Sequence, residues 1–206
     1  LKPSITKNHY TNFGPVQLKL ENYISNLIKL KKRKVLMLSS ATSGIHLLSK
    51  FFEYKLKKKI TWIICDFNFF SANNLHLSKS IILDSNKLGL IDEDILTNYL
   101  KKNKKKNLGV IFTNIFGQIE NWSIIRKICV KNNIPFFVDN ATGLFRRPNN
   151  CENDFEAISF HHTKPWGIGE GGCIIIPSHH YSILKSMINF GSNNFKKLNS
   201  YSSNFK

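Results

Sequence analysis

Residues 158–176 read ISFHHTKPWGIGEGGCIII and place one lysine, Lys164, between an apolar strand and a glycine-rich turn. Most of the 30 Lys and Arg residues lie in runs or at polar positions. Lys164, in contrast, comes after Ile-Ser-Phe and before Pro-Trp, a setting that can strip water from its amine. A desolvated lysine loses its proton more easily and becomes a nucleophile towards a carbonyl carbon, as a Schiff base requires. Lys164 is therefore the candidate catalytic residue.

Outward from this stretch, apolar runs alternate with segments of helical spacing. Strands are predicted at residues 35–38, 60–65, 81–83, 108–112, 134–138, 155–160 and 172–176, and helices at 17–30, 45–54, 92–100, 121–130 and 178–189. Such alternation implies crossover units and a mainly parallel sheet with helices on both faces. The predicted fold is an α/β three-layer α/β/α sandwich. Residues 1–16 show no periodicity, and residues 66–73 are expected to lead into a further helix.

Two features lie where ligands of such sheets bind, beyond the carboxyl ends of the strands. Asp139 directly follows the strand at residues 134–138. The hydroxyl-rich turn SSATSG, residues 39–44, joins the first strand to a helix. A turn of this kind presents backbone amides and hydroxyls to an anion such as phosphate. Simple N-capping of the helix by Thr42 or Ser43 explains the same residues, so both interpretations remain open.

Length and composition predict one globular domain. The chain has 206 residues, 42% of them hydrophobic, which is enough for a sizeable core. No apolar run approaches the roughly 18 residues of a membrane span, and the first residues lack a signal-peptide core. We therefore expect a cytoplasmic protein without membrane contact. The 4 cysteines are widely spaced, which predicts reduced thiols instead of a zinc site or a disulfide framework.

The formal charge of +17 raises the alternative of a polyanion-binding surface. The position of the charges argues against nucleic acid as a partner. Basic runs at residues 31–34, 55–59 and 101–106 fall where helices are expected to end, and cations there complement the helix dipole. The favoured interpretation is a solvated basic surface.

Two motif-like patterns are set aside. Residues 167–172 match G-x-G-x-x-G, but these glycines precede a strand, whereas a dinucleotide-binding fingerprint follows a strand and opens a helix. His161 and His162 suggest metal ligands, yet no third ligand lies at a suitable sequence spacing. No metal site is predicted, and structural or pocket-edge roles are favoured for the two histidines.

An ordered series of motifs resembles the DegT/DnrJ type of nucleotide-sugar aminotransferases, which depend on pyridoxal 5′-phosphate (PLP) and belong to the fold-type I aspartate aminotransferase superfamily. The series extends from about residue 12 to the end of the chain. Its most specific part is Ser-Phe-His-x-x-Lys followed by Gly-Glu-Gly-Gly. The matching pieces are NFGP at 12–15 with Leu20-Glu21, SATS at 40–43 with His46, NFFS at 68–71, FGQ at 116–118, VDNA at 138–141, SFHHTK at 159–164 and GEGG at 169–172.

The resemblance implies a role for each site residue. Lys164 corresponds to the lysine that carries PLP covalently and then moves a proton during amino transfer. Asp139 corresponds to the aspartate that binds the pyridine nitrogen, and Phe69 to the aromatic residue that stacks on the ring. The phosphate contacts fall on Thr42, Ser43, Ser159 and, from the neighbouring subunit, Asn204. Taken singly, Asp139 also fits a turn cap, Phe69 a core residue and Ser159 an ordinary strand residue.

Three departures from the family pattern are visible. Ala41 stands where the family commonly has Gly. Thr142 stands where the family usually has Gln or His, and it is shorter than that residue, which contacts the ring hydroxyl of PLP. A sugar-dehydrating branch replaces the lysine by histidine, so Lys164 favours amino transfer. The chain is also much shorter than family members, as if truncated after the large domain.

The resemblance and the periodicity together give the expected organisation. Residues 1–30 form an N-terminal segment and helix, residues 31–190 a PLP-binding large domain, and residues 191–206 a polar tail that begins a missing C-terminal part. The implied protein is a homodimer that transfers an amino group, from glutamate or another amino-acid donor, to a nucleotide-linked keto sugar for polysaccharide or related sugar biosynthesis. The alternative is a truncated, non-catalytic remnant of this fold.

Overall fold

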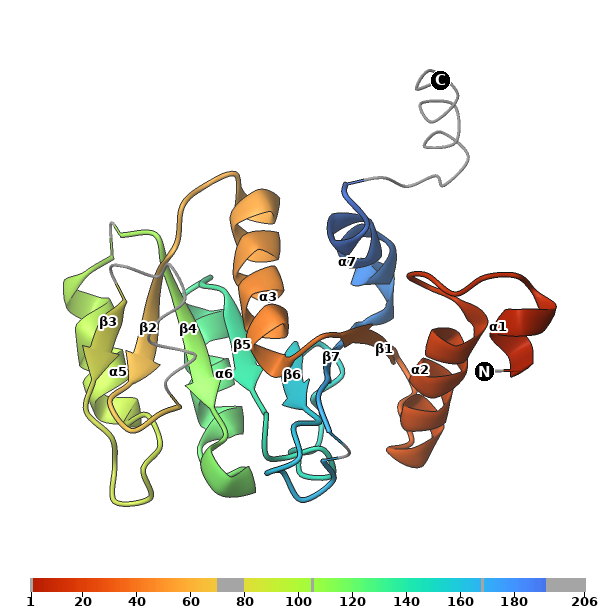
Figure 1. The fold of residues 1–206 in the computed structure, drawn as a ribbon. Helices are drawn as coiled ribbons and strands as arrows, with labels where there is room; N and C mark the ends of the chain where they lie inside the picture. Colours follow the sequence, from red (N-terminus) through yellow and green to blue (C-terminus); the bar gives the residue numbers. More distant parts are fainter. Residues whose placement is uncertain (1, 70–79, 105, 168, 192–206) are drawn as a thin grey trace.

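The computed structural model describes residues 2–69, 80–104, 106–167 and 169–191, and centres on a seven-stranded sheet in the order β1-β7-β6-β5-β4-β2-β3 (Figure 1). Strands β2 to β6 run parallel to one another, whereas β7 is antiparallel to both of its neighbours, β6 and β1. The mainly parallel sheet expected from the sequence is therefore confirmed. The strands are β1 (Arg33–Leu38), β2 (Thr61–Cys65), β3 (Ile81–Leu83), β4 (Leu108–Thr113), β5 (Phe136–Asp139), β6 (Glu156–Ser159) and β7 (Gly172–Pro177).

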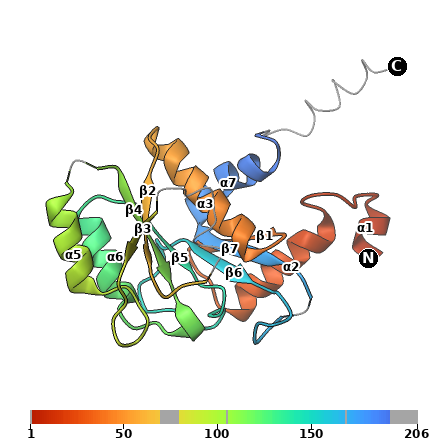
Figure 2. The same ribbon diagram turned by 60° about the vertical axis from the view of Figure 1, so that its left-hand side comes forward.

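Helices cover both faces of the sheet, as Figures 1 and 2 show. Helices α3 and α7 share one apolar cluster with the sheet, and α5 and α6 share a second cluster on the opposite face. A third cluster joins α2 to β1, β6 and β7. This arrangement confirms the three-layer sandwich. The helices are α1 (Lys2–Thr6), α2 (Pro15–Leu27), α3 (Ala41–Leu56), α5 (Glu93–Lys102), α6 (Trp122–Lys131) and α7 (Tyr181–Ile188), with 3₁₀ turns at Ile115–Gly117 and Ser178–His180.

Burial on both faces explains why the central strands are apolar throughout. Every residue of β4, LGVIFT, is buried, and so is every residue of β5, β6 and β7. A strand enclosed between two helical layers has no solvent face, so it lacks the polar alternation of a half-exposed strand. None of the described helices is both long and apolar enough to cross a bilayer.

Helix α3 lies unusually close to the sheet because of two glycines. A Cβ on Gly44 would lie 2.9 Å from Ile174 Cγ2 in β7, and a Cβ on Gly172 would overlap the backbone of Ser40. The beginning of β7 therefore passes directly against the N-terminus of α3. Ser40 is the N-cap, and its hydroxyl accepts a hydrogen bond from Ser43 N at 3.1 Å. The expectation that Thr42 or Ser43 caps this helix is wrong, because the helix starts at Ala41 and both residues lie in its first turn.

The N-terminal segment differs from the sequence expectation. Residues 1–16 show no periodicity, yet Lys2–Thr6 form α1, which is too short for a periodic signal.

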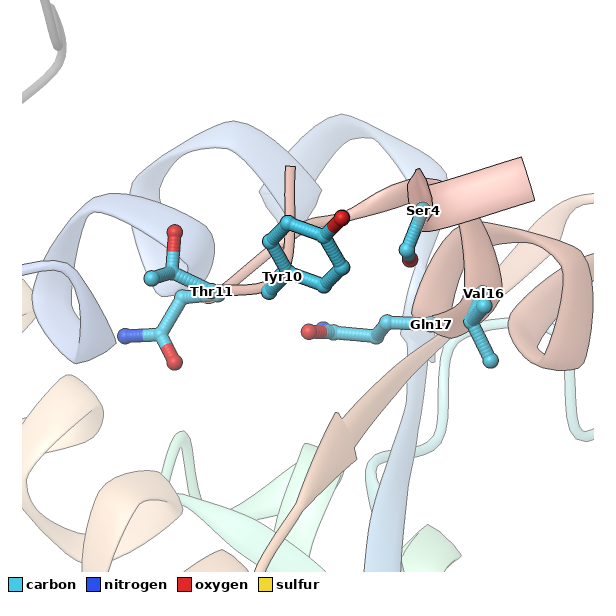
Figure 3. A pocket seen from close by; sticks show the side chains of 7 residues that line it. Ser4, Tyr10, Thr11, Val16 and Gln17 are labelled. Atoms are coloured by element: carbon cyan, nitrogen blue, oxygen red, sulfur yellow. The ribbon is translucent and has the colours of Figure 1, made fainter. Parts of the chain in front are cut away.

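A hollow of about 280 Å³ lies beside α1 and the start of α2, and Figure 3 shows Tyr10, Thr11 and Gln17 around it. Gln17 Nε2 donates to Glu21 Oε1 at 3.0 Å, and that buried carboxylate accepts from Met37 N and the Tyr181 hydroxyl. Glu21 thus joins α2 to β1 and α7.

Candidate active site

Three polar side chains lie where neighbouring strands end, on the face covered by α3. Thr113 is paired with Asp139, and Asp139 with Ala157, in the register of β4, β5 and β6. Ser159 lies two residues beyond Ala157, and alternate residues of a strand share a face. Their neighbours Ile111, Phe137 and Ala157 belong to the apolar cluster of α3. The sheet therefore brings Thr113, Asp139 and Ser159 together at the carboxyl ends of β4, β5 and β6, near the start of α3.

Asp139 is a buried carboxyl group with few partners. Its side chain is 2% exposed, and Oδ1 accepts a hydrogen bond from Ala141 N at 3.2 Å, so the turn-cap interpretation applies to one of its oxygens. Burial raises the pKa of Asp139 to about 6, while the Ala141 amide and the Lys164 ammonium act to lower that pKa. The influence of Lys164 acts through space, because no ion pair joins these two described side chains. Asp139 and Lys164 are therefore electrostatic neighbours without direct contact.

Lys164 lies in a tight turn that follows β6. Its amide donates to His161 O at 2.9 Å, and its carbonyl accepts from Gly167 N at 2.9 Å. The side chain is half-buried, and Nζ lies 5.1 Å from the centroid of the Phe69 ring. Phe69 is 58% exposed, so the core interpretation of this residue is wrong. The Phe69 ring and the Lys164 amine therefore lie next to each other.

The hydroxyl-rich start of α3 lies next to Ser159. Ser159 is paired with Gly172, which in turn lies against the backbone of Ser40. Ser43 Oγ lies 2.9 Å from Ser39 Oγ and 3.0 Å from Ser40 Oγ, and Thr42 is exposed. The structure thus groups Thr42, Ser43 and Ser159 at a helix N-terminus, where free amides and the helix dipole favour an anion. Asn204 lies outside the described residues.

A buried ionic network holds the turn that follows Asp139. Asn140 Nδ2 donates to Glu156 Oε2 at 2.7 Å, and Glu156 also forms ion pairs with Arg33 and Arg147. Burial alone raises the pKa of Glu156, but the two guanidinium groups outweigh it and keep that pKa below its usual value. Asn140 Oδ1 accepts from Asn114 Nδ2 at 2.6 Å, which joins the turn to the end of β4.

Arg33 is buried in this network, although the sequence predicts a solvated basic run there. The sequence places residues 31–34 on a solvated helix end, but Arg33 belongs to β1 and is 5% exposed. Lys55 and the Lys101-Lys102 pair do lie in the last turns of α3 and α5, as expected. Arg33 differs because an acidic partner, Glu156, lies on a strand close to β1 in space but far from it in sequence.

Sequence reasoning missed two polar residues at the end of β4. Thr113 Oγ1 and Asn114 Oδ1 are buried and have no hydrogen-bond partner in the part of the chain that the structure describes. Thr142, a predicted contact, donates its hydroxyl to Asn114 O at 3.1 Å. The available signal was the position of Thr113-Asn114 directly after an apolar strand, the same signal that identified Asp139. Unpaired polar atoms beside Asp139 are what a polar ligand would satisfy.

Replacing Thr113 by valine is expected to stabilise the ligand-free protein. Valine has nearly the same shape and removes a buried hydroxyl whose missing partner costs about 1–3 kcal/mol. We expect the free energy of unfolding, measured by urea denaturation, to rise by about 1 kcal/mol or more. Ser49→Ala is the matched control, because the buried Ser49 hydroxyl is satisfied by Ile45 O at 2.9 Å and its removal should bring no comparable gain. A loss of stability in Thr113→Val would show that the hydroxyl is satisfied in solution.

The two histidines before Lys164 have a third polar neighbour after all. One potential ligand atom each from His161, His162 and Glu170 lies within 4.8 Å of the other two. The absence of a third ligand inferred from sequence spacing is therefore wrong. The chain reverses direction after the turn at Lys164, which brings Glu170 next to His161 and His162.

The chain is similar in sequence and fold to known aminotransferases. A model of the DegT/DnrJ/EryC1/StrS aminotransferase family matches residues 1–205. A protein of Bacillus cereus assigned as a PLP-dependent aminotransferase is 25% identical, with a TM-score of 0.77 over 92% of this chain and 54% of that one. DesI, solved in the presence of its TDP-sugar product, is 18% identical, with a TM-score of 0.75 over 92% and 48%. Helicobacter pylori PseC, an aminotransferase involved in pseudoaminic acid biosynthesis, is 22% identical, with a TM-score of 0.66 over 84% and 48%. The chain spans about half the length of these proteins.

Proposed function

Because the chain belongs to the DegT/DnrJ/EryC1/StrS aminotransferase family, whose members depend on PLP, we propose that it forms the cofactor-binding part of a sugar aminotransferase. The observation that carries this proposal is a buried carboxyl group within electrostatic range of an amine. The Lys164 ammonium acts to lower the pKa of Asp139, which ends β5 beside the hydroxyl-rich N-terminus of α3. We propose residues 31–190 as the PLP-binding domain.

The residues present fit the chemistry of PLP. The cofactor has a basic ring nitrogen, an aldehyde and a phosphate, and these need an acid, an amine and an anion site. Asp139 supplies the acid, Lys164 the amine, and Thr42, Ser43 and Ser159 the hydroxyls at a helix N-terminus. Thr113 Oγ1 and Asn114 Oδ1, which have no partner within the described part of the chain, leave further polar capacity beside Asp139. Thr142 remains a proposed contact, although its hydroxyl is engaged by Asn114 O. Asn204 remains a proposed contact outside the described residues.

When bound, PLP supplies an electron-withdrawing ring that stabilises negative charge on the carbon that loses a proton. The chain's own residues provide the rest. With a pKa of about 6, the Asp139 carboxyl is ionised at neutral pH and can hold a proton on the ring nitrogen by its negative charge. The exposed Phe69 ring, next to Lys164 Nζ, offers an apolar surface that stacks on a flat ring. Lys164 Nζ would hold the cofactor and would accept and return the proton at the substrate carbon.

The substrate is proposed by analogy with the structural neighbours. DesI was solved with a TDP-sugar product. We propose a nucleotide-linked keto sugar as the amino acceptor, glutamate as the donor, a homodimer as the active form and the cytoplasm as its location. The alternative is a non-catalytic domain of this fold that binds PLP without completing amino transfer.

The donor half of the reaction separates these two functions. The purified chain is loaded with PLP, freed of excess cofactor and mixed with isotopically labelled glutamate. We expect one equivalent of labelled 2-oxoglutarate and conversion of PLP to pyridoxamine phosphate, both measured by chromatography. Retention of PLP without 2-oxoglutarate would identify a binding domain that needs further residues. Failure to retain PLP would contradict the proposed function.

A further inference from the structure

We propose that His161, His162 and Glu170 form a binding site for a divalent transition-metal ion such as Zn²⁺. Two imidazoles and a carboxylate are ligands that zinc accepts in proteins, with water completing the coordination. One ligand atom from each residue lies within 4.8 Å of the others. The site rests on these three side chains alone and does not depend on the proposed aminotransferase function.

The backbone holds both sides of the site in place. His162 N donates to Gly169 O at 2.7 Å, and His161 forms an isolated parallel bridge with Gly169. Glu170 lies between Gly169 and Gly171, whose φ angles of 137° and 147° are rarely adopted by residues with side chains. These glycines allow the chain to turn so that Glu170 faces the histidines. The backbone contacts therefore hold the two segments that carry these side chains next to each other.

The spacing of one ligand pair already matches a zinc site. Zn–N and Zn–O bonds of about 2.0–2.2 Å place two ligand atoms of a tetrahedral ion about 3.3–3.6 Å apart. His161 Nε2 lies 3.3 Å from Glu170 Oε1. The other ring nitrogen, Nδ1, lies 2.8 Å from Thr163 Oγ1 and accepts a hydrogen bond from Thr163 N at 3.3 Å, and these contacts hold the ring in place. His162 is exposed, and its ring is tilted against that of His161 with the ring centroids 4.1 Å apart.

Other groups in the chain compete poorly for the ion. Burial raises the pKa of each of the four cysteine thiols, so thiolate ligands are scarce at neutral pH. His179 and His180 form a second adjacent pair, with ring centroids 4.0 Å apart. Within the described residues, however, that pair has no third ligand group of the kind found at His161, His162 and Glu170. It therefore provides an internal control for unspecific binding to neighbouring histidines.

A metal ion at this position would close the turn that carries Lys164. His161 and His162 precede Lys164 and Glu170 follows it, so a shared ion would link the two sides of the turn. We expect Zn²⁺ to raise the midpoint of thermal unfolding, because an ion that binds the folded chain stabilises it by mass action. Because PLP is absent from this measurement, its outcome is distinct from that of the proposed catalytic function.

The test uses the full chain, purified without a histidine tag and freed of metal by chelator treatment. Zn²⁺ binding is measured by calorimetry, and Co²⁺ binding by the visible absorption that reports tetrahedral coordination. We expect one equivalent of ion, with affinity at least tenfold weaker in both His162→Gln and Glu170→Gln and unchanged in His179→Gln. Circular dichroism without metal verifies that each variant is folded. Equal affinity in wild type, His162→Gln and Glu170→Gln, a loss confined to His179→Gln, or no binding to wild type would each overturn the proposal.

Discussion

Lys164→Ala is expected to abolish covalent capture of PLP. The wild-type chain, mixed with PLP and reduced with borohydride, should gain one phosphopyridoxyl group on the tryptic peptide that contains Lys164. The physical reason is position: Nζ is half-buried, 5.1 Å from the Phe69 ring and close enough to Asp139 to influence its pKa. Alanine removes the nucleophile. Mass spectrometry of the intact protein and of its peptides measures the result, together with the visible absorption of protein-bound PLP.

A matched control separates this effect from the general reactivity of lysine. Lys185 also lies over an aromatic ring, with Nζ 4.5 Å from the centroid of Phe13. Its helix, α7, follows the end of β7, which is antiparallel to β6 and therefore ends away from the carboxyl end of β5 that holds Asp139. Lys185→Ala should therefore capture PLP like the wild type. PLP retained at one equivalent by Lys164→Ala, or distributed over many lysines in the wild type, would contradict the assignment of Lys164.

Asp139→Asn is expected to stabilise the PLP-free protein at neutral pH while impairing its use of PLP. Burial raises the pKa of Asp139 from 3.8 to about 6, so the folded protein disfavours the ionised carboxylate. A group with a raised pKa contributes stability that is fully present below about pH 4 and is lost as the pH rises through about 6. A shift of this size corresponds to about 3 kcal/mol. Asparagine lacks the charge, and its side-chain oxygen can still accept the Ala141 amide.

Denaturant unfolding at two pH values tests the sign. Near pH 4 the wild type and Asp139→Asn should differ little, whereas at pH 7.5 the variant should be more stable by about 2–3 kcal/mol. Equal stability at both values would show that the Asp139 carboxyl is not desolvated in solution. A variant that is less stable at pH 7.5 would show that the ionised carboxylate has a stabilising partner.

Asp139→Asn should also lose catalytic function, because PLP needs the negative charge whose burial destabilises the PLP-free protein. A neutral amide cannot hold the ring nitrogen of PLP in its protonated form, so we expect 2-oxoglutarate formation from glutamate to fall at least a hundredfold. Asp154→Asn is the control, because Asp154 is also buried but its carboxylate is held by Arg126 at 2.8 Å and by the Trp122 indole at 2.9 Å. With folding verified by circular dichroism, Asp154→Asn should retain PLP capture. Wild-type rates in Asp139→Asn would remove Asp139 from the proposed mechanism.

Local sequence predicted most secondary structure because local forces control it. The helix predicted at residues 92–100 is α5, and the carboxylate of Asp92 caps it by accepting from Asp94 N and Ile95 N. The strand at residues 81–83 and the pair of strands around the lysine turn lie where apolar runs placed them. The cap of α3 was misplaced, because several neighbouring hydroxyls in SSATSG satisfy the same local rule. Helix α1 was missed, because five residues carry too little periodicity.

By itself, the sequence determined the α/β class, the family and the candidate residues Lys164 and Asp139, because these depend on apolar periodicity and on motifs of neighbouring residues. Tertiary structure alone decided that Arg33 is buried against Glu156, that Thr113 Oγ1 finds no partner beside Asp139 among the described residues, and that Glu170 lies next to His161. Each of these contacts joins residues from different strands or opposite sides of a turn. Strand order and reversal of the chain direction create such contacts, and neither can be inferred from the local sequence.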